Sequence, residues 1–211
     1  MRTAYPPPVP GLFVTLEGPE GSGKSTQLGL LAEALASSHD PVVVREPGGT
    51  ALGEALRDVL LHRSELEICP EAEAYLFMAA RAELVAERIG PALAAGRLVL
   101  SDRYHDATRV YQGEVGGVTV DWPSSFPRPD LTALLLVPPE LGLKRQVAAR
   151  GAPDRIGGRS LDFHRQVVEG YRRLAEAEPD RFLVVDGTRP PEAVRDEVLA
   201  RIHRLLVGAA P

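Results

Sequence analysis

The stretch "LEGPEGSGKST" (residues 16–26) decides the fold of this chain, because Gly18 to Ser25 matches the pattern G-x-x-x-x-G-K-[ST] at every fixed position. An apolar run precedes it and a helical pattern begins near Lys24, which is the order of a phosphate-binding P-loop. In such a loop the backbone N–H groups and the helix N-terminus face phosphate oxygens, the lysine neutralises the β- and γ-phosphates and the serine hydroxyl reaches Mg²⁺. A chance glycine-rich turn is the alternative, and the flanking patterns weigh against it. We expect ATP or GTP binding through Gly18, Pro19, Glu20, Gly21, Ser22, Gly23, Lys24, Ser25 and Thr26.

Outward from this loop, apolar runs bounded by Gly or Pro alternate with helical patterns, which is typical of parallel strands joined by crossover helices. The runs predict strands at 12–17, 41–46, 97–102, 131–137 and 181–187. Helices are expected to begin near Lys24, Ala51, Pro70, His105, Pro139, Ser160 and Pro190, with a break near Gly90-Pro91. We predict an α/β fold with a five-stranded, doubly wound parallel sheet, helices on both faces and ligands at the carboxyl ends of the strands.

Composition narrows the class of protein. The chain has 211 residues, 44% of them hydrophobic, so we expect residues 11–211 to form a single domain. A net charge of −5 argues against a nucleic-acid-binding face, and Cys69, the one cysteine, excludes an internal disulfide and fits a reducing compartment. No apolar run reaches the roughly 18 residues of a membrane span, and no signal peptide is visible. We expect a cytoplasmic protein with no membrane partner, and a flexible proline-rich extension at residues 1–10.

The stretch "LVLSDRYHDATRVYQG" (residues 98–113) indicates a second polar site at the end of the third strand. Asp102 ends that strand, where a carboxylate can hold Mg²⁺ together with Ser25. Arg103 follows and can present a bidentate guanidinium to an acceptor phosphate. A surface ion pair is the alternative for Asp102 and Arg103. Tyr104 is expected to pack in the core.

Two further motifs flank this site. In "REPGGT" (residues 45–50) the chain leaves the second strand and turns at a Gly-Gly pair that permits close backbone approach to a ligand. In "YLFMAARAELV", Phe77 and Arg81 are four residues apart and share one helical face, so the ring can stack on a base while the guanidinium bonds its carbonyl. The commoner alternative for this spacing is a core aromatic beside a surface arginine.

The segment 148–160, here called the lid segment, belongs to a run in which basic residues surround glycine and proline. Its positive charge beside a P-loop favours a mobile cover that excludes water during phosphoryl transfer, and a solvated basic loop is the alternative. The basic residues of the run are Lys144, Arg145, Arg150, Arg155 and Arg159.

The motifs GxxxxGKS, REPGGT, FxxxR, DRYxxxxxxYQ and an arginine-rich loop occur in this order, and together they resemble the thymidylate kinase family over about residues 11–207. The resemblance implies a P-loop nucleoside monophosphate kinase fold, phosphoryl transfer from ATP to dTMP with Mg²⁺ in dTTP synthesis, and a homodimer packed through helices. It also implies catalytic roles for Lys24, Arg103, Arg150, Arg155 and Glu20.

The same resemblance implies how the acceptor is held. The base stacks on Phe77 and bonds Arg81, Thr108 faces the base edge with Gln112 nearby, and Glu20 lies near the 3′-hydroxyl. Arg45 and Arg103 hold the phosphate, and Tyr111 lies under the sugar, where it disfavours a 2′-hydroxyl. The dTMP site is therefore expected at Glu20, Arg45, Pro47, Phe77, Arg81, Arg103, Thr108, Tyr111 and Gln112, with Thr188 and Arg189 near the adenine of ATP.

The chain also departs from the family pattern. The P-loop has no arginine, as in the bacterial subgroup that carries its arginines in the lid, and Ala107, Val110, Leu136 and Gly157 stand where other residue types are usual. The rival interpretations are a kinase for another monophosphate or a small alcohol, a nucleotide-dependent switch, and an inactive relative. The absence of a guanine-reading N-K-x-D segment weighs against a GTPase switch.

Overall fold

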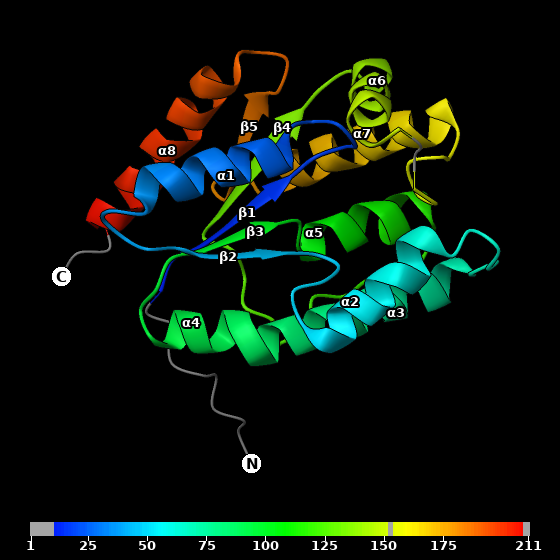
Figure 1. The fold of residues 1–211 in the computed structure, drawn as a ribbon, viewed down its shortest axis with the longest axis horizontal. Helices are drawn as coiled ribbons and strands as arrows, with labels where there is room; N and C mark the ends of the chain where they lie inside the picture. Colours follow the sequence, from blue (N-terminus) through cyan, green and yellow to red (C-terminus); the bar gives the residue numbers. More distant parts are fainter. Residues whose placement is uncertain (1–10, 152–153, 209–211) are drawn as a thin grey trace.

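The structure is a computed structural model that describes residues 11–151 and 154–208. Its centre is a five-stranded parallel sheet of order β2-β3-β1-β4-β5 (Figure 1). The strands are β1 (Phe13–Glu17), β2 (Val42–Arg45), β3 (Val99–Asp102), β4 (Leu131–Leu136) and β5 (Phe182–Asp186). The helices are α1 (Lys24–Leu35), α2 (Ala51–Arg57), α3 (Pro70–Leu84), α4 (Gly90–Ala94), α5 (His105–Thr108), α6 (Pro139–Arg150), α7 (Leu161–Ala177) and α8 (Pro191–Gly208), with π-helical turns at Asp58–His62, Val85–Ile89 and Arg109–Val115.

Alternate residues of each strand face opposite helix layers. Val14 and Leu16 of β1 pack with α1 and α8 on one face, whereas Phe13 packs on the other face in a cluster with residues of α3 and α4. The apolar side of α7 adds Tyr171 to this second face, beside Tyr111. The sheet is covered on both sides, which explains why its strands appear in the sequence as nearly continuous apolar runs.

The five predicted strands and the doubly wound parallel sheet are confirmed, with ends that differ by two residues or fewer. The predicted break near Gly90-Pro91 appears as a π-helical turn, in which the Gly90 N–H donates to the carbonyl of Val85. Proline has no N–H to donate, so a disturbance of the helix next to Pro91 is expected. The sequence pattern did not predict the other two π-helical turns.

The sheet order brings the ends of β1, β3 and β4 together, because β1 lies between the other two strands. The chain runs from β1 to β2 on one side of β1 and later from β3 to β4 on the other side, so the carboxyl edge there is a switch point at which loops diverge and leave room for a ligand. The P-loop follows β1 at this point, and Asp102 ends the neighbouring β3.

Within residues 11–151 and 154–208, none of the helices is both long enough and apolar enough to cross a membrane. The extension predicted at residues 1–10 lies outside the described residues.

Candidate active site

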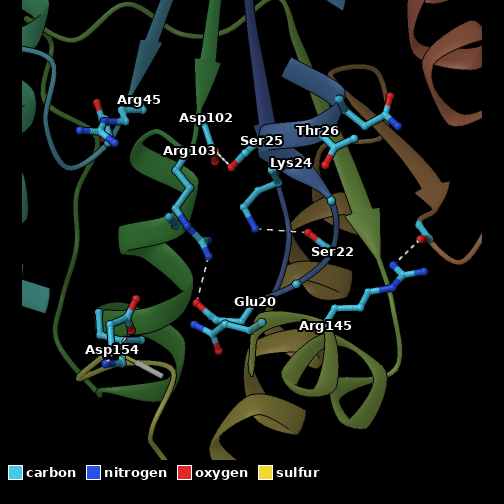
Figure 2. A pocket seen from close by; sticks show the side chains of 18 of the residues that line it. Glu20, Ser22, Lys24, Ser25, Thr26, Arg45, Asp102, Arg103, Arg145 and Asp154 are labelled. Carbon is cyan, nitrogen blue, oxygen red and sulfur yellow. Dashed lines mark hydrogen bonds and ion pairs between the residues drawn. The ribbon is translucent and has the colours of Figure 1, made fainter. Parts of the chain in front are cut away.

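A cavity of about 680 Å³ opens at the carboxyl edge of the sheet. The P-loop, the ends of β2 and β3, α3, α5 and the lid segment all contribute to its walls. Figure 2 shows the P-loop with Arg45, Asp102 and Arg103 at the strand ends and Asp154 of the lid segment. The cavity has the size of a typical ligand site and lies at the place expected for an open α/β sheet. The predicted site residues that line it are Glu20, Gly21, Ser22, Gly23, Lys24, Ser25, Thr26, Arg45, Pro47, Phe77, Asp102, Arg103, Thr108, Tyr111, Gln112 and Arg189.

The P-loop backbone requires glycine where the chain turns most sharply. Gly18 has a φ of 140°, and a Cβ there would lie 2.2 Å from the carbonyl oxygen of Leu135. Gly23 has a φ of 98° and directly precedes α1, so the N-terminus of the helix opens into the cavity. This geometry supplies a ready-made anion site at the start of α1.

Lys24 turns back over this loop. Its Nζ donates to the carbonyls of Gly18 and Pro19 at 3.0 and 2.8 Å and lies 3.2 Å from the hydroxyl of Ser22. Burial, together with the charge of Arg103, lowers the pKa of Lys24 to about 8. Phosphate oxygens that enter the loop would replace these neutral carbonyl acceptors with negatively charged ones and so stabilise the charged ammonium group.

Ser25 and Asp102 meet as the metal hypothesis requires. The hydroxyl of Ser25 donates to Oδ2 of Asp102 at 2.7 Å across the β1–β3 pair, and both residues line the cavity. A hydroxyl and a carboxylate are hard oxygen ligands of the kind that Mg²⁺ uses together with substrate phosphates. The donor set present therefore fits Mg²⁺.

Arg103 and Glu20 form the floor of the cavity beside Lys24. One guanidinium nitrogen of Arg103 lies 3.0 Å from Oε1 of Glu20, and the Tyr111 hydroxyl donates to the two oxygens of that carboxylate at 2.9 and 2.7 Å. Figure 2 shows Arg103 descending from the end of β3 to Glu20 in the P-loop. The structure brings these three predicted acceptor residues into one hydrogen-bonded group.

His164 of α7 completes the surroundings of Glu20. Its ring is almost fully buried, with Nδ1 3.4 Å from Oε2 of Glu20 and Nε2 3.2 Å from the carbonyl of Gly157 in the lid segment. Burial alone would raise the pKa of Glu20, but His164 and the charge of Arg103 lower it to about 2. Glu20 is therefore a carboxylate at neutral pH, and sequence reasoning did not single out the histidine that faces it.

The wall that sequence analysis assigned to a base contains Phe77, Thr108 and Gln112. The hydroxyl of Thr108 is buried, and no hydrogen-bond partner for it exists among the described residues. A buried polar atom without a partner is costly, so this hydroxyl is well placed to bond a ligand that enters the cavity. Gln112 donates its Nε2 to Glu73 at 2.7 Å.

Arg81 is the first predicted residue whose position differs from the expectation. Only about 1% of its side chain is exposed, and it does not line the cavity. Its guanidinium pairs with Glu46 at 2.6 Å and donates to the carbonyl of Tyr104 at 3.1 Å. The structure places Arg81 behind the cavity wall, because a buried carboxylate and a backbone carbonyl already occupy its donors.

The arginines of the lid segment are the second difference. Arg155 pairs with Glu73 of α3 and donates through Nε to the carbonyl of Leu60 at 2.8 Å, while Arg159 lies 3.0 Å from the same carboxylate. In this conformation both guanidinium groups point to α3, and neither residue lines the cavity. Arg150 ends α6, and its side chain lies outside the described part of the structure.

The remaining predicted residues have structural partners. Arg45 pairs with Glu54 at 3.0 Å at the cavity rim. Thr188 donates to Asp186 through both its N–H and its hydroxyl and does not line the cavity, whereas the adjacent Arg189 does. Gly18 and Pro19 contribute through their carbonyls, which accept from the Lys24 ammonium group.

Six polar residues that line the cavity had not been assigned to the site, namely Gln27, Glu46, Arg57, Arg145, Gln146 and Asp154. Arg57 donates to the carbonyl of Pro47 at 2.8 Å, Arg145 donates to the carbonyl of Gly187 at 2.9 Å, and Gln146 lies next to Arg145 on α6. Arg145 could have been found from its place in the basic run. Arg57 and Gln146 carry no comparable sequence signal, since ordinary helical patterns surround them.

Comparison with known proteins shows the family to which this chain belongs. A sequence model described as thymidylate kinase matches residues 16–198. The chain belongs to the thymidylate kinase family. A thymidylate kinase of Thermomicrobium roseum is 47% identical over 202 residues, covering 92% of this chain and 95% of that protein. A thymidylate kinase of Deinococcus radiodurans is 46% identical over 200 residues, with 91% and 96% covered.

The fold agrees with a solved member of the thymidylate kinase family. The crystal structure of thymidylate kinase from Ehrlichia chaffeensis superposes with a TM-score of 0.72 at 28% sequence identity, covering 92% of this chain and 98% of that one. The P-loop kinase fold predicted from the sequence is thus confirmed.

One departure from the family pattern has a packing reason in this chain. A Cβ at Gly157 would lie 2.4 Å from Nε2 of Gln146, so the lid segment packs closely on α6 at this position. Ala107, another departure from the family pattern, lines the cavity.

Proposed function

We propose that this chain transfers the γ-phosphoryl group of ATP to the 5′-phosphate of dTMP and releases ADP and dTDP. The observation that carries the proposal is a single cavity in which the P-loop, with Lys24, opens beside the Arg103, Glu20 and Tyr111 group. A donor phosphate in the loop and an acceptor phosphate at Arg103 would then face each other. Membership in the thymidylate kinase family supports the assignment of the acceptor as dTMP.

Catalysis in this proposal consists of positioning and charge neutralisation. Lys24 stabilises the oxygens of the transferred group, and Arg103 orients the acceptor phosphate oxygen in line with it. Because the acceptor phosphate is already ionised at neutral pH, no strong base is needed. Ser25 and Asp102 would hold Mg²⁺, which supplies further positive charge to the donor phosphates.

The acceptor nucleoside is assigned to the remaining wall. Phe77 offers a ring face for the base, and the unpaired hydroxyl of Thr108 offers a hydrogen bond to its edge, next to Gln112. Tyr111, held by Glu20, lies where the sugar is expected, so a 2′-hydroxyl would have to displace this pair. Deoxynucleotides are therefore preferred over ribonucleotides.

The lid arginines act only after a rearrangement in this proposal. Arg155 and Arg159 have to leave Glu73 before their charges can reach the transferring phosphate. Arg150, the last residue of α6 and part of the lid segment, is the third candidate. Closure would exclude water and add positive charge at the moment of transfer.

We also propose a cytoplasmic homodimer that buries apolar side chains of α2 and α3. Leu52 on α2, Leu66 in the α2–α3 connection and Tyr75 on α3 are exposed large hydrophobic side chains, and Tyr75 is 73% exposed. Exposed apolar groups on adjacent helices favour association between copies. Light scattering over a range of concentrations is expected to give the dimer mass, and a constant monomer mass would overturn this assembly.

The reaction is tested by coupled ADP release with Mg·ATP in the presence of dTMP, dUMP, dCMP, dGMP, UMP or no acceptor. We expect dTMP to stimulate ADP release well above the other nucleotides. If none of the acceptors stimulates ADP release by folded, ATP-binding protein, the assignment fails and a nucleotide switch or an inactive relative takes its place.

A further inference from the structure

Arg103 has an unusual backbone for the residue type. Its φ is +70°, and among the described residues only Asp40 shares a positive φ without being glycine. The left-handed region is uncommon for residues with a Cβ and persists where the surroundings hold it in place. Something in this fold therefore fixes the residue that we assign to the acceptor phosphate.

Buried groups on both sides of Arg103 hold this conformation. The N–H of Arg103 donates to the carbonyl of Leu16 at 3.0 Å, and the Ser101 hydroxyl donates to the Arg103 carbonyl at 2.6 Å. The next N–H, that of Tyr104, donates to Oε1 of Glu17 at 2.7 Å. Glu17 and Ser101 are fully buried, so these hydrogen bonds form away from competing water.

The same carboxylate also reaches the side chain of Arg103. Oε2 of Glu17 accepts the hydroxyl hydrogen of Tyr171 at 2.7 Å, and the Tyr171 oxygen in turn accepts from Nη1 of Arg103 at 3.2 Å. Nη1 also donates to the Gly18 carbonyl at 3.0 Å, and Nη2 contacts Glu20. One buried carboxylate thus fixes the backbone through Tyr104 and the guanidinium through Tyr171.

We propose that Glu17 and Tyr171 are positioning residues that aim Arg103 at the acceptor phosphate. Neither residue lines the cavity, so they act through Arg103 and do not contact the reacting atoms. This inference rests on the proposed function, since it gives Arg103 its task in the kinase reaction.

The charge of Glu17 adds a pH dependence. Burial raises the pKa of Glu17 to about 7, although the charge of Arg103 opposes the rise. The charged or titratable groups that face it are Arg103, Asp106 and Tyr171, with Lys24 close enough to interact electrostatically. As the pH falls through 7, Glu17 gains a proton and loses acceptor capacity for the Tyr104 N–H or the Tyr171 hydroxyl. The kcat/KM for dTMP is therefore expected to decline below about pH 7.

Tyr171→Phe tests the proposal, and Tyr104→Phe is its matched control. Both tyrosines are fully buried on the same face of the sheet, but the Tyr104 hydroxyl lacks a hydrogen-bond partner within the described residues. Tyr171→Phe is expected to lower kcat/KM for dTMP about 10-fold, the effect of one hydrogen bond to a charged group, with KM for ATP unchanged. Tyr104→Phe is expected to stay within about 2-fold of wild type. Equal kinetics for the two variants would overturn the proposal.

A second readout does not depend on turnover. In ¹⁵N-labelled protein, the immobilised Arg103 guanidinium is expected to give resolved Nη–H signals in wild type and Tyr104→Phe, and exchange-broadened signals in Tyr171→Phe. If wild type shows no dTMP-stimulated ADP release, the proposed function fails while this spectrum still decides whether Tyr171 holds Arg103. Unchanged signals in Tyr171→Phe count against the positioning role.

Glu17→Gln supplies the pH test and a second variant should Tyr171→Phe not fold. The wild-type profile of kcat/KM for dTMP is expected to rise through about pH 7, and Glu17→Gln is expected to lack this limb. An identical limb in both proteins would remove Glu17 from the proposal.

Discussion

The P-loop side of the cavity and the lid segment differ in how far their charges are already in place. On the P-loop side, Lys24, Asp102 and Arg103 line the cavity. Asp102 accepts a hydrogen bond from Ser25, and Arg103 pairs with Glu20. On the lid side, Arg155 and Arg159 turn away and share Glu73. The sheet fixes the position of residues at strand ends, whereas residues of a connecting segment are held only by their side-chain contacts and move more easily.

The largest expected effect comes from breaking the P-loop side. Arg103→Ala is expected to lower kcat by on the order of 10²-fold or more, about 3 kcal/mol of transition-state stabilisation, because the charge it removes needs no rearrangement to act. Lys24→Ala is expected to cost at least as much. Steady-state ADP release measures both, with Arg165→Ala, an exposed arginine paired with Glu140, as the control. Turnover near that of wild type in Arg103→Ala would refute its assignment.

A smaller effect is expected from the lid side. Arg155→Ala is expected to lower kcat by roughly 10- to 10²-fold, since one transition-state charge is lost while the P-loop charges remain. Single-turnover measurements at saturating ATP and dTMP separate this loss from weaker binding. Arg173→Ala, an exposed arginine of α7 paired with Glu114, is the matched control. If Arg155→Ala matches that control, the lid guanidinium does not take part in transfer.

Glu73→Gln tests the same comparison at the carboxylate that pairs with Arg155 and Arg159. Removing the carboxylate charge weakens both arginine contacts and the bond from Gln112, so the lid segment is expected to open more often. Amide exchange of residues 154–159 is expected to accelerate by about 10-fold, while the P-loop amides exchange as before. Glu71→Gln, at an exposed position in the first turn of α3, is the control. Equal exchange in both variants would show that Glu73 does not hold the lid.

The sequence predicted the P-loop side well because a local motif specifies it. Gly18 to Ser25 encode their own backbone geometry, and the run that ends at Asp102 is recognisable as a buried strand from its composition alone. Parallel strands place their carboxyl ends at one edge of the sheet, so the residue pattern by itself was enough to pair Ser25 with Asp102.

Sequence reasoning placed the other residues less well, because their partners come from distant segments. Arg81 is spaced correctly from Phe77, yet its donors go to Glu46, which is 35 residues away. Glu73, Tyr171 and His164 read as ordinary helix residues, and only packing of α3 and α7 around the P-loop gives them charged neighbours. Helical periodicity indicates which side of a helix is buried but not which charge it meets.

The smallest expected effect on catalysis concerns Glu46, which lines the cavity and pairs with the buried Arg81 behind its wall. Burial raises the pKa of Glu46 to about 7 in the folded chain, while Arg81 opposes the rise. The folded state therefore binds more protons than the unfolded state between about pH 4.5 and 7, so this contribution favours folding below that range and is lost as the pH rises through 7. Denaturant unfolding at pH 5 and pH 7.5 is expected to show a loss of about 2 kcal/mol in wild type that Glu46→Gln lacks. If the unfolding free energy changes between these pH values by the same amount in wild type and in Glu46→Gln, Arg81 holds Glu46 ionised throughout. The ion pair would then belong with the preassembled charges of the P-loop side.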